Sequence, residues 1–234
     1  KAIASKGICL LLDFDGTISE IVLRPSAAKP VAGAINYLAI LSQNPRVKIF
    51  VISGRSKEWL AEKLGGVKAV LIGEHGARGL SPSLRNLFFE VSDFLNTFAQ
   101  FFPGSLVEVK KSSISLHYRG VGISAQKKLV AALTAELNNF LPKTVSVISG
   151  KKVLEIVFSK RNKGDVVREI IKKNQRAFFI AIGADTTDET MFKEVNAMKG
   201  LSICVGKKRD SQARYFVKTH SAVVEVLAAI AEKT

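Results

Sequence analysis

The stretch Asp13-Phe14-Asp15-Gly16-Thr17 comes directly after the apolar run Ile8–Leu12. Such a run, apolar at every position, is typical of a strand buried on both faces of a parallel sheet. Gly16 permits a tight turn after the strand, and the turn can bring two carboxylates close together. One carboxylate can then act as a nucleophile and the other as a general acid/base. The alternative is structural, since Asp and Gly are common turn residues at strand ends.

Further apolar runs follow along the chain and alternate with segments of helical periodicity. The runs cover 47–53, 69–72, 178–183 and 201–205, and the helical segments cover 32–43, 57–64, 164–174, 187–198 and 221–232. Strands that alternate with helices in this way predict βαβ units. We therefore expect an α/β fold with a doubly wound parallel sheet.

Residues 84–158 interrupt this alternation. There the pattern predicts helices over 85–102 and 125–140, strands over 106–110, 114–118, 144–148 and 153–157, and turns at 103–104 and 149–150. Two helix-plus-hairpin units of this kind indicate an inserted α+β domain. We expect a core made of residues 1–83 and 159–234, with residues 84–158 as a smaller cap domain.

Composition excludes several classes of protein. The 234 residues carry a net charge of +15, and 47% of them are hydrophobic, which argues against global disorder. The charge is spread as +5, +4 and +6 over residues 1–83, 84–158 and 159–234, so we expect no nucleic-acid partner but a surface that favours anionic substrates. No apolar run is long enough for a membrane span. Cys9 and Cys204 lie far apart in apolar runs, which predicts a reducing, cytoplasmic location.

The other predicted strand ends carry polar residues too. Ser53 and Gly54 close one strand and open a helix, a position suited to phosphate, although a simple helix-capping Ser is the alternative. Asp185 and Asp188 follow another strand, where they either offer oxygen ligands to Mg²⁺ or cap the next helix. Lys163 precedes a helix and can bring a positive charge to a phosphate, but a single Lys is more often solvated.

Taken in order, the motif Asp-x-Asp-Gly-Thr, a Ser, a Lys and an acidic cluster resemble the four-motif signature of the haloacid dehalogenase superfamily. The resemblance implies a Rossmann-like, haloacid dehalogenase-like core, with the insert at the place of that superfamily's type-two caps. It also implies that Asp13 attacks phosphorus, that Asp15 is the general acid/base, and that Ser53, Gly54 and Lys163 bind phosphate. Mg²⁺ would be held by Asp13, the Asp15 backbone carbonyl and Asp185 or Asp188.

Within the insert, the segments 108–110, 117–119 and 150–155 resemble trehalose-6-phosphate phosphatases, as do Glu74-His75-Gly76 and the spacing of 185–189. The resemblance runs from about residue 7 to 205. It implies a Mg²⁺-dependent phosphatase acting on trehalose 6-phosphate through an aspartyl-phosphate, and a possible synthase partner or fused domain outside this chain. The residues implied in sugar binding are Glu108, Lys110, Glu155, His75 and Arg119.

The sequence departs from the family pattern in two places. Ala184 stands where the family has an Asp that commonly binds the metal, and Val157 and Phe158 stand near an expected Arg and Pro. Two alternatives therefore remain, a phosphatase for another sugar phosphate and a catalytically impaired sugar-phosphate-binding protein. The chain begins with Lys1, and we expect a fragment or a processed form.

Overall fold

The computed structural model describes residues 7–22, 25–77, 79–158, 161–206 and 210–234. These divide into two compact units, which we call the core unit (Lys1–Gly76 with Arg161–Thr234) and the inserted unit (Ala77–Lys160). Each unit has a hydrophobic core of its own.

A six-stranded parallel sheet forms from the described residues of the core unit, in the order β10-β9-β8-β1-β2-β3. The strands are β1 (Ile8–Leu12), β2 (Val47–Ile52), β3 (Val70–Ile72), β8 (Phe178–Gly183), β9 (Leu201–Val205) and β10 (Tyr215–Val217). All five residues of β1 are buried, because helices cover the sheet on both faces. The expected α/β fold with a doubly wound parallel sheet is confirmed.

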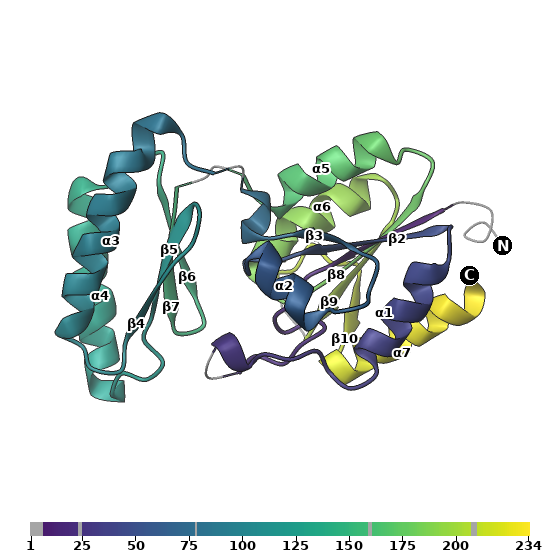
Figure 1. Cartoon of the computed structure of the whole chain (residues 1–234), viewed down its shortest axis with the longest axis horizontal. Helices are drawn as coiled ribbons and strands as arrows, with labels where there is room; N and C mark the ends of the chain where they lie inside the picture. The colour runs from purple at the N-terminus through teal and green to yellow at the C-terminus, as the bar shows by residue number, and fades with distance from the viewer. Residues whose placement is uncertain (1–6, 23–24, 78, 159–160, 207–209) are drawn as a thin grey trace. The chain divides into compact units, whose positions relative to one another are not determined.

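Helices α1 and α7 cover one face of this sheet, and α5 and α6 cover the other (Figure 1). The helices of the core unit are α1 (Ala34–Gln43), α2 (Lys57–Lys63), α5 (Lys163–Lys173), α6 (Glu189–Ala197) and α7 (His220–Lys233). Short 3₁₀ turns lie at Pro25–Ala27, Glu74–Gly76 and Thr186–Asp188. The last of these corrects the expected helix start at 187, since α6 itself begins at Glu189.

The inserted unit packs two helices against one face of an antiparallel sheet with the order β4-β5-β7-β6. Its elements are a 3₁₀ turn (Pro82–Leu84), α3 (Arg85–Gln100), β4 (Leu106–Val109), β5 (Ser113–His117), α4 (Ile123–Phe140), β6 (Ser146–Gly150) and β7 (Val153–Val157). The turn expected at 149–150 lies instead at 151–152, where Lys152 adopts a left-handed backbone with a φ of 66°.

Strand register separates the two faces of this sheet. Ile114, Leu116, Leu154 and Ile156 alternate onto the helix side and join the buried core. Glu108 pairs with Ser115, which pairs in turn with Glu155, so these three polar residues form a row on the opposite face. The sequence alternation thus builds a polar sheet surface in the inserted unit.

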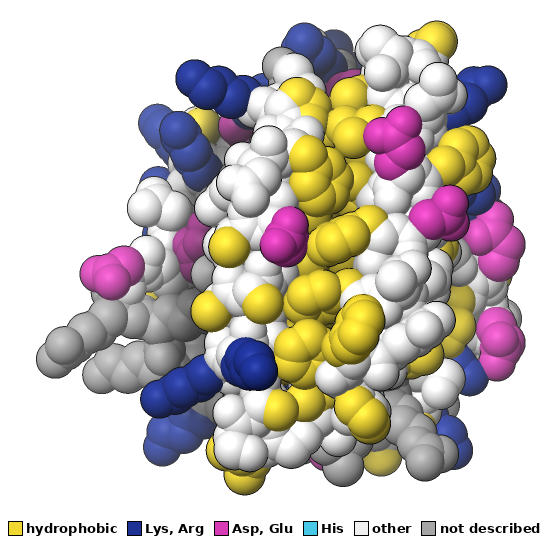
Figure 2. All heavy atoms as spheres, turned by 90° about the vertical axis from the view of Figure 1, so that its left-hand side faces the viewer, with side chains coloured by type: hydrophobic (Ala, Val, Ile, Leu, Met, Phe, Trp, Pro, Cys, Tyr) yellow, Lys and Arg dark blue, Asp and Glu magenta, His cyan; other side chains and the backbone are white. Residues whose placement is uncertain are grey.

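The helical side of the inserted unit also exposes apolar groups. Figure 2 shows hydrophobic side chains gathered along the furrow between α3 and α4. Phe89, Phe101 and Ile123 are among the exposed residues, and Ile123 is 87% exposed. Across the described residues, no helix combines the length and the apolar character needed to span a bilayer.

Candidate active site

Asp13 lies immediately beyond the carboxyl end of β1 and is buried, with 4% of its surface exposed. Its backbone N–H continues the pairing with β8 by donating to the Ile182 carbonyl at 3.0 Å. The carboxylate accepts a hydrogen bond from Thr17 Oγ1 on Oδ2 at 3.1 Å. Gly16 has a φ of 80°, a left-handed conformation that favours glycine, so it closes the turn between Asp13 and Thr17.

Lys163 begins α5 and is 1% exposed. Its Nζ donates to Asp13 Oδ1 at 2.6 Å and to Asp188 Oδ1 at 2.7 Å. Asn162 caps the helix and fixes its start through a reciprocal pair of hydrogen bonds with Asp165. Lys163 is therefore a buried bridge between two carboxylates, and the alternative of a solvated lysine is wrong.

Asp188 has no exposed surface and uses both of its oxygens. Oδ1 accepts from Lys163, while Oδ2 accepts from the backbone N–H groups of Ala184 and Asp185 at 2.8 and 3.0 Å. Gly183 permits this loop, since a Cβ there would lie 2.4 Å from Asp188 Cγ. Asp188 thus holds the loop that follows β8 and joins it to Lys163.

Asp185 also acts as a cap, because its Oδ1 accepts from the Thr187 N–H and hydroxyl groups at 2.7 and 2.6 Å. The expected capping role is present, and it coexists with closeness to the other charges of the site. Asp185 influences the pKa of Asp13 and that of Lys163 through its charge. The sequence-predicted residues Asp13, Lys163, Asp185 and Asp188 therefore form one cluster.

Burial and the neighbouring charges together set the direction of each pKa in this cluster. Burial raises the pKa of Asp13 well above its usual range, the charge of Asp188 adds to the rise, and Lys163 opposes it. Burial also raises the pKa of Asp188. For Asp185 the effect of burial is outweighed by Lys163 and by the Thr187 hydrogen bonds, so its pKa is lowered. The pKa of Lys163 is raised because the neighbouring carboxylates outweigh its burial.

Asp15 forms its ion pair with Arg55 and not with Lys163. Arg55 donates from Nε to Asp15 Oδ2 at 2.7 Å and from a terminal nitrogen to Oδ1 at 2.6 Å, a bidentate pair. The Arg55 guanidinium also stacks on the Trp59 ring at 4.4 Å. Sequence reasoning missed Arg55, although it follows Ser53 and Gly54 directly at the same strand end. Its position next to that motif was the available signal.

Ser53 and Gly54 follow β2, and Ser53 is 1% exposed. The Ser53 hydroxyl accepts from the Arg55 N–H at 3.2 Å. His75 packs against Gly54, since a Cβ at Gly54 would lie 2.8 Å from His75 Nε2. His75 therefore lies in the core unit beside the predicted phosphate-binding segment, whereas the other predicted sugar-binding residues lie in the inserted unit.

The polar sheet face of the inserted unit holds two groups of contacts. Glu155 Oε1 accepts from Lys110 Nζ at 3.0 Å and from the Ser113 hydroxyl at 2.8 Å. Glu108 Oε2 lies 2.8 Å from His117 Nε2. Arg119 instead donates to the backbone carbonyl of Lys151 at 2.8 Å, in the turn between β6 and β7. The fold thus joins Lys110 to Glu155 and Glu108 to His117.

The departure at Phe158 has a structural explanation. Phe158 is 3% exposed and packs on Phe88 with their ring centroids 5.0 Å apart, inside the core of the inserted unit. Val157, in contrast, pairs with Ser113 and with Ser146 and lies in the sheet. Phe158 is therefore a packing residue of this domain.

The carboxylate oxygens of Asp13 and Asp185 are the hard ligands that Mg²⁺ prefers, and one or two protein carboxylates commonly suffice beside a substrate phosphate. The Ala184 side chain adds no oxygen ligand. It packs against the turn that follows Asp15, where a Cβ placed on Gly16 would lie 3.1 Å from the Ala184 Cβ. Over the ranges that the structure describes, no three acidic, His or Cys side chains form a complete metal site. Asp13 and Asp185 therefore offer oxygen donors of the kind that Mg²⁺ prefers, but the described side chains do not by themselves complete a site for the ion.

Comparison with known proteins agrees with this geometry. A sequence model of the trehalose-phosphatase family matches residues 11–221. A probable trehalose-phosphate phosphatase of Sinorhizobium fredii is 30% identical, over 95% of this chain and 87% of that protein. Alpha,alpha-trehalose-phosphate synthase [UDP-forming] B of Dictyostelium discoideum is 31% identical over 92% of this chain.

The chain spans only 29% of the length of that synthase. Among solved structures, the C-terminal domain of a Candida albicans trehalose-6-phosphate phosphatase has the same fold. It superposes with a TM-score of 0.83 at 24% identity, over 97% of this chain and 92% of that one. On the family match and the Sinorhizobium relative, the chain belongs to the trehalose-phosphatase family.

Proposed function

We propose that this chain releases phosphate from trehalose 6-phosphate. The observation that carries the proposal is the buried bridge of Lys163 between Asp13 and Asp188, at the carboxyl end of the central strand β1. This is the edge of an open α/β sheet at which ligands commonly bind. Membership of the trehalose-phosphatase family supports the choice of substrate.

In the proposed reaction, an Asp13 carboxylate oxygen attacks phosphorus while the bond from phosphorus to the sugar oxygen breaks. Asp15 donates a proton to that departing oxygen. It then takes a proton from a water molecule, which attacks the aspartyl-phosphate and releases inorganic phosphate and free Asp13. In this structure Arg55 holds both Asp15 oxygens, so at least one of these two hydrogen bonds must open before Asp15 can donate or accept a proton. Arg55 is therefore a positioning residue in the proposed reaction.

The phosphoryl oxygens need positive charge and hydrogen-bond donors, and we assign these to Lys163, Ser53 and the backbone at Gly54. We place Mg²⁺ on Asp13, the Asp15 backbone carbonyl and Asp185. Asp185 is preferred to Asp188 because it is exposed, whereas Asp188 has no exposed surface and both of its oxygens accept hydrogen bonds. When bound, the ion would offset the negative charge of the phosphoryl group.

We assign the inserted unit the part of a cap domain that carries the sugar-binding groups. Glu108, Lys110 and Glu155 offer carboxylates and an ammonium group to sugar hydroxyls, and we add His75 and Arg119 to this set. A cap that closes over bound substrate would keep water away from the aspartyl-phosphate until the sugar has left. The Dictyostelium relative is named a synthase and is much longer than this chain, so we propose a synthase partner or fused synthase domain.

Ala184 favours a second candidate function, a sugar-phosphate-binding protein with little or no turnover. A methyl group cannot coordinate a cation, so metal affinity should be lower than with the Asp that the family pattern has at this position. Binding of trehalose 6-phosphate without phosphate release is the property that distinguishes this candidate from the phosphatase.

One experiment separates the two functions. We expect the purified chain with Mg²⁺ to release phosphate from trehalose 6-phosphate, and Asp13→Asn to lower that rate by at least ~10³-fold, since a nucleophile cannot be replaced by an amide. The matched control is Asp93→Asn, which removes an exposed carboxylate from α3 and should leave the rate unchanged. Full activity of Asp13→Asn would contradict the mechanism. Calorimetric binding without turnover in the wild type would favour the binding protein.

A further inference from the structure

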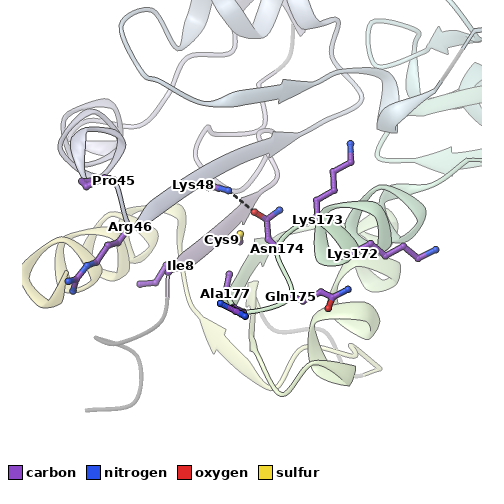
Figure 3. A pocket seen from close by; sticks show the side chains of 12 residues that line it. Ile8, Cys9, Pro45, Arg46, Lys48, Lys172, Lys173, Asn174, Gln175 and Ala177 are labelled. Carbon is purple, nitrogen blue, oxygen red and sulfur yellow. Dashed lines mark hydrogen bonds between the residues drawn. The ribbon is translucent and has the colours of Figure 1, made fainter.

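A cavity lies at the end of the core sheet away from Asp13, at the amino ends of β1, β2 and β8. Its volume is about 860 Å³, and residues 7–9, 45, 46, 48 and 172–177 line it (Figure 3). Pockets that bind small molecules commonly enclose ~300–1,000 Å³. Asp13 follows the carboxyl end of β1, so this cavity and the candidate active site lie at opposite ends of the same strand.

The cavity is strongly basic. Arg46 and Lys48 come from the start of β2, and Lys172, Lys173 and Arg176 come from the end of α5 and the loop after it. None of the described residues that line it is acidic. Lys172 and Lys173 lie in the last turn of α5, where cations stabilise the helix dipole. The helix dipole does not account for Arg46 or Lys48, because they lie at the start of β2 and not in α5.

One of these cations is already positioned. Lys48 Nζ donates to Asn174 Oδ1 at 2.8 Å, and Figure 3 shows the two side chains pointing toward one another. Asn174 is itself fixed, since its Nδ2 donates to the Ile170 carbonyl at 2.8 Å. An ammonium group has three protons, and the bond to Asn174 uses one of them. Lys48 can therefore hold an anion without first losing much side-chain freedom.

The floor of the cavity adds no opposing charge. Ile8 and Cys9 are buried there, at the start of β1. Burial raises the pKa of the Cys9 thiol to about 11, and the nearby charge of Lys48 only partly opposes the rise. The thiol is therefore neutral at physiological pH. The cavity combines a small apolar floor with a basic rim.

We propose that this basic cavity binds a polyphosphate chain, carried by a nucleoside triphosphate or present as free inorganic polyphosphate. A chain of several linked phosphates can reach more of the cations that line this cavity than a single phosphate can. Lys side chains bind phosphate as point charges, and Arg side chains can bind two oxygens at once. The site is separate from Asp13 and does not depend on the proposed phosphatase activity.

Calorimetric titration of the whole chain near physiological salt tests the proposal, with tripolyphosphate, ATP and orthophosphate as probes. We expect tripolyphosphate and ATP to bind and orthophosphate to bind at least ~10-fold more weakly. Equal affinity for the first two would identify the phosphate chain as the whole ligand, and tighter ATP binding would add the nucleoside to it. Asp13→Asn should bind both as the wild type does.

The double variant Lys48→Gln/Lys173→Gln should weaken binding of both probes at least ~10-fold, because each lost charge contact contributes to affinity. Its matched control, Lys127→Gln/Lys128→Gln, removes the same charge from exposed positions of α4 and should change affinity less than twofold. Equal losses in both variants, or no binding to the wild type, would overturn the proposal. So would affinity that rises steadily with the length of a single-stranded oligonucleotide, which would indicate a nucleic-acid surface.

Discussion

Each unit of this protein holds a lysine against acidic side chains, but the two lysines differ in their surroundings. Lys163 in the core unit touches Asp13 and Asp188, and none of the three side chains is more than 5% exposed. Lys110 in the inserted unit touches Glu155, and these side chains are 13% and 15% exposed. Glu155 also accepts from Ser113, so it has a neutral donor besides the cation.

The same kind of charge pair is thus held in two environments that differ in exposure to water. Charges that are fully buried cannot exchange partners with water, so the Lys163 cluster is held in a fixed geometry. A fixed cluster is suited to stabilising the charge of a phosphoryl group during reaction. Charges nearer to solvent lose less when they change partners. The lesser burial of the Lys110 cluster therefore agrees with the sugar-binding role that we propose for it.

The largest effect that we predict comes from Lys163→Met. The substitution keeps most of the side-chain volume but leaves two buried carboxylates without their cation. We expect the free energy of unfolding to fall by ~3–5 kcal/mol, measured by urea denaturation. The control Lys193→Met, at an exposed position of α6, should cost less than ~0.5 kcal/mol. A loss below ~1 kcal/mol for Lys163→Met would mean that the two clusters do not differ as their burial indicates.

A smaller effect, on Mg²⁺ affinity, is expected from a substitution that adds a carboxylate to the buried cluster. Ala184→Asp should raise Mg²⁺ affinity at least ~10-fold, because it adds a hard oxygen ligand beside Asp185 and the turn after Asp15. Turnover should rise with it, but the affinity is measured independently, by calorimetry with Mg²⁺ alone. Ala184→Asn is the matched control, since it adds a side chain of similar size without the charge. Equal Mg²⁺ affinity in the wild type and Ala184→Asp would show that another group replaces the missing ligand.

The sequence predicted the sheet well where the strands are buried on both faces. β1 and β8 are continuous apolar runs, β2 and β9 are apolar except for Lys48 and Ser202, and the bounds of all four agree with the prediction to within a residue. β10 was not predicted, because it has three residues and its Tyr215 and Phe216 are exposed, so it lacks the apolar run of a central strand. The α5 helix begins at Lys163 itself, one residue earlier than its periodicity suggested.

The candidate site was predicted less completely, for a physical reason. Side chains at the ends of parallel strands converge, so the grouping of Asp13 with Asp185 and Asp188 follows from the sheet. The burial of Lys163 does not, because it depends on a contact with Asp13 across 150 positions of sequence. Arg55 was missed for the same reason, since its bidentate bond to Asp15 joins residues that are 40 positions apart.

The smallest effect on stability is expected from Lys110→Met in the inserted unit. Glu155 keeps its hydrogen bond from Ser113, and the polar face lies closer to solvent, so the free energy of unfolding should fall by only ~1 kcal/mol. Binding should respond more strongly than folding. We expect the Kd for trehalose 6-phosphate to rise ~10-fold, because a hydrogen bond to a charged group commonly contributes ~1.5–3 kcal/mol.

The control for Lys110→Met is Lys143→Met, an exposed lysine of the same unit, which should change neither quantity. If Lys110→Met destabilised the fold as much as Lys163→Met and left sugar-phosphate binding intact, the Lys110 cluster would be structural. The two lysines would then differ only in how deeply they are buried and not in what they do. A loss of binding without a loss of stability would instead place ligand recognition in the inserted unit and charge stabilisation in the core unit.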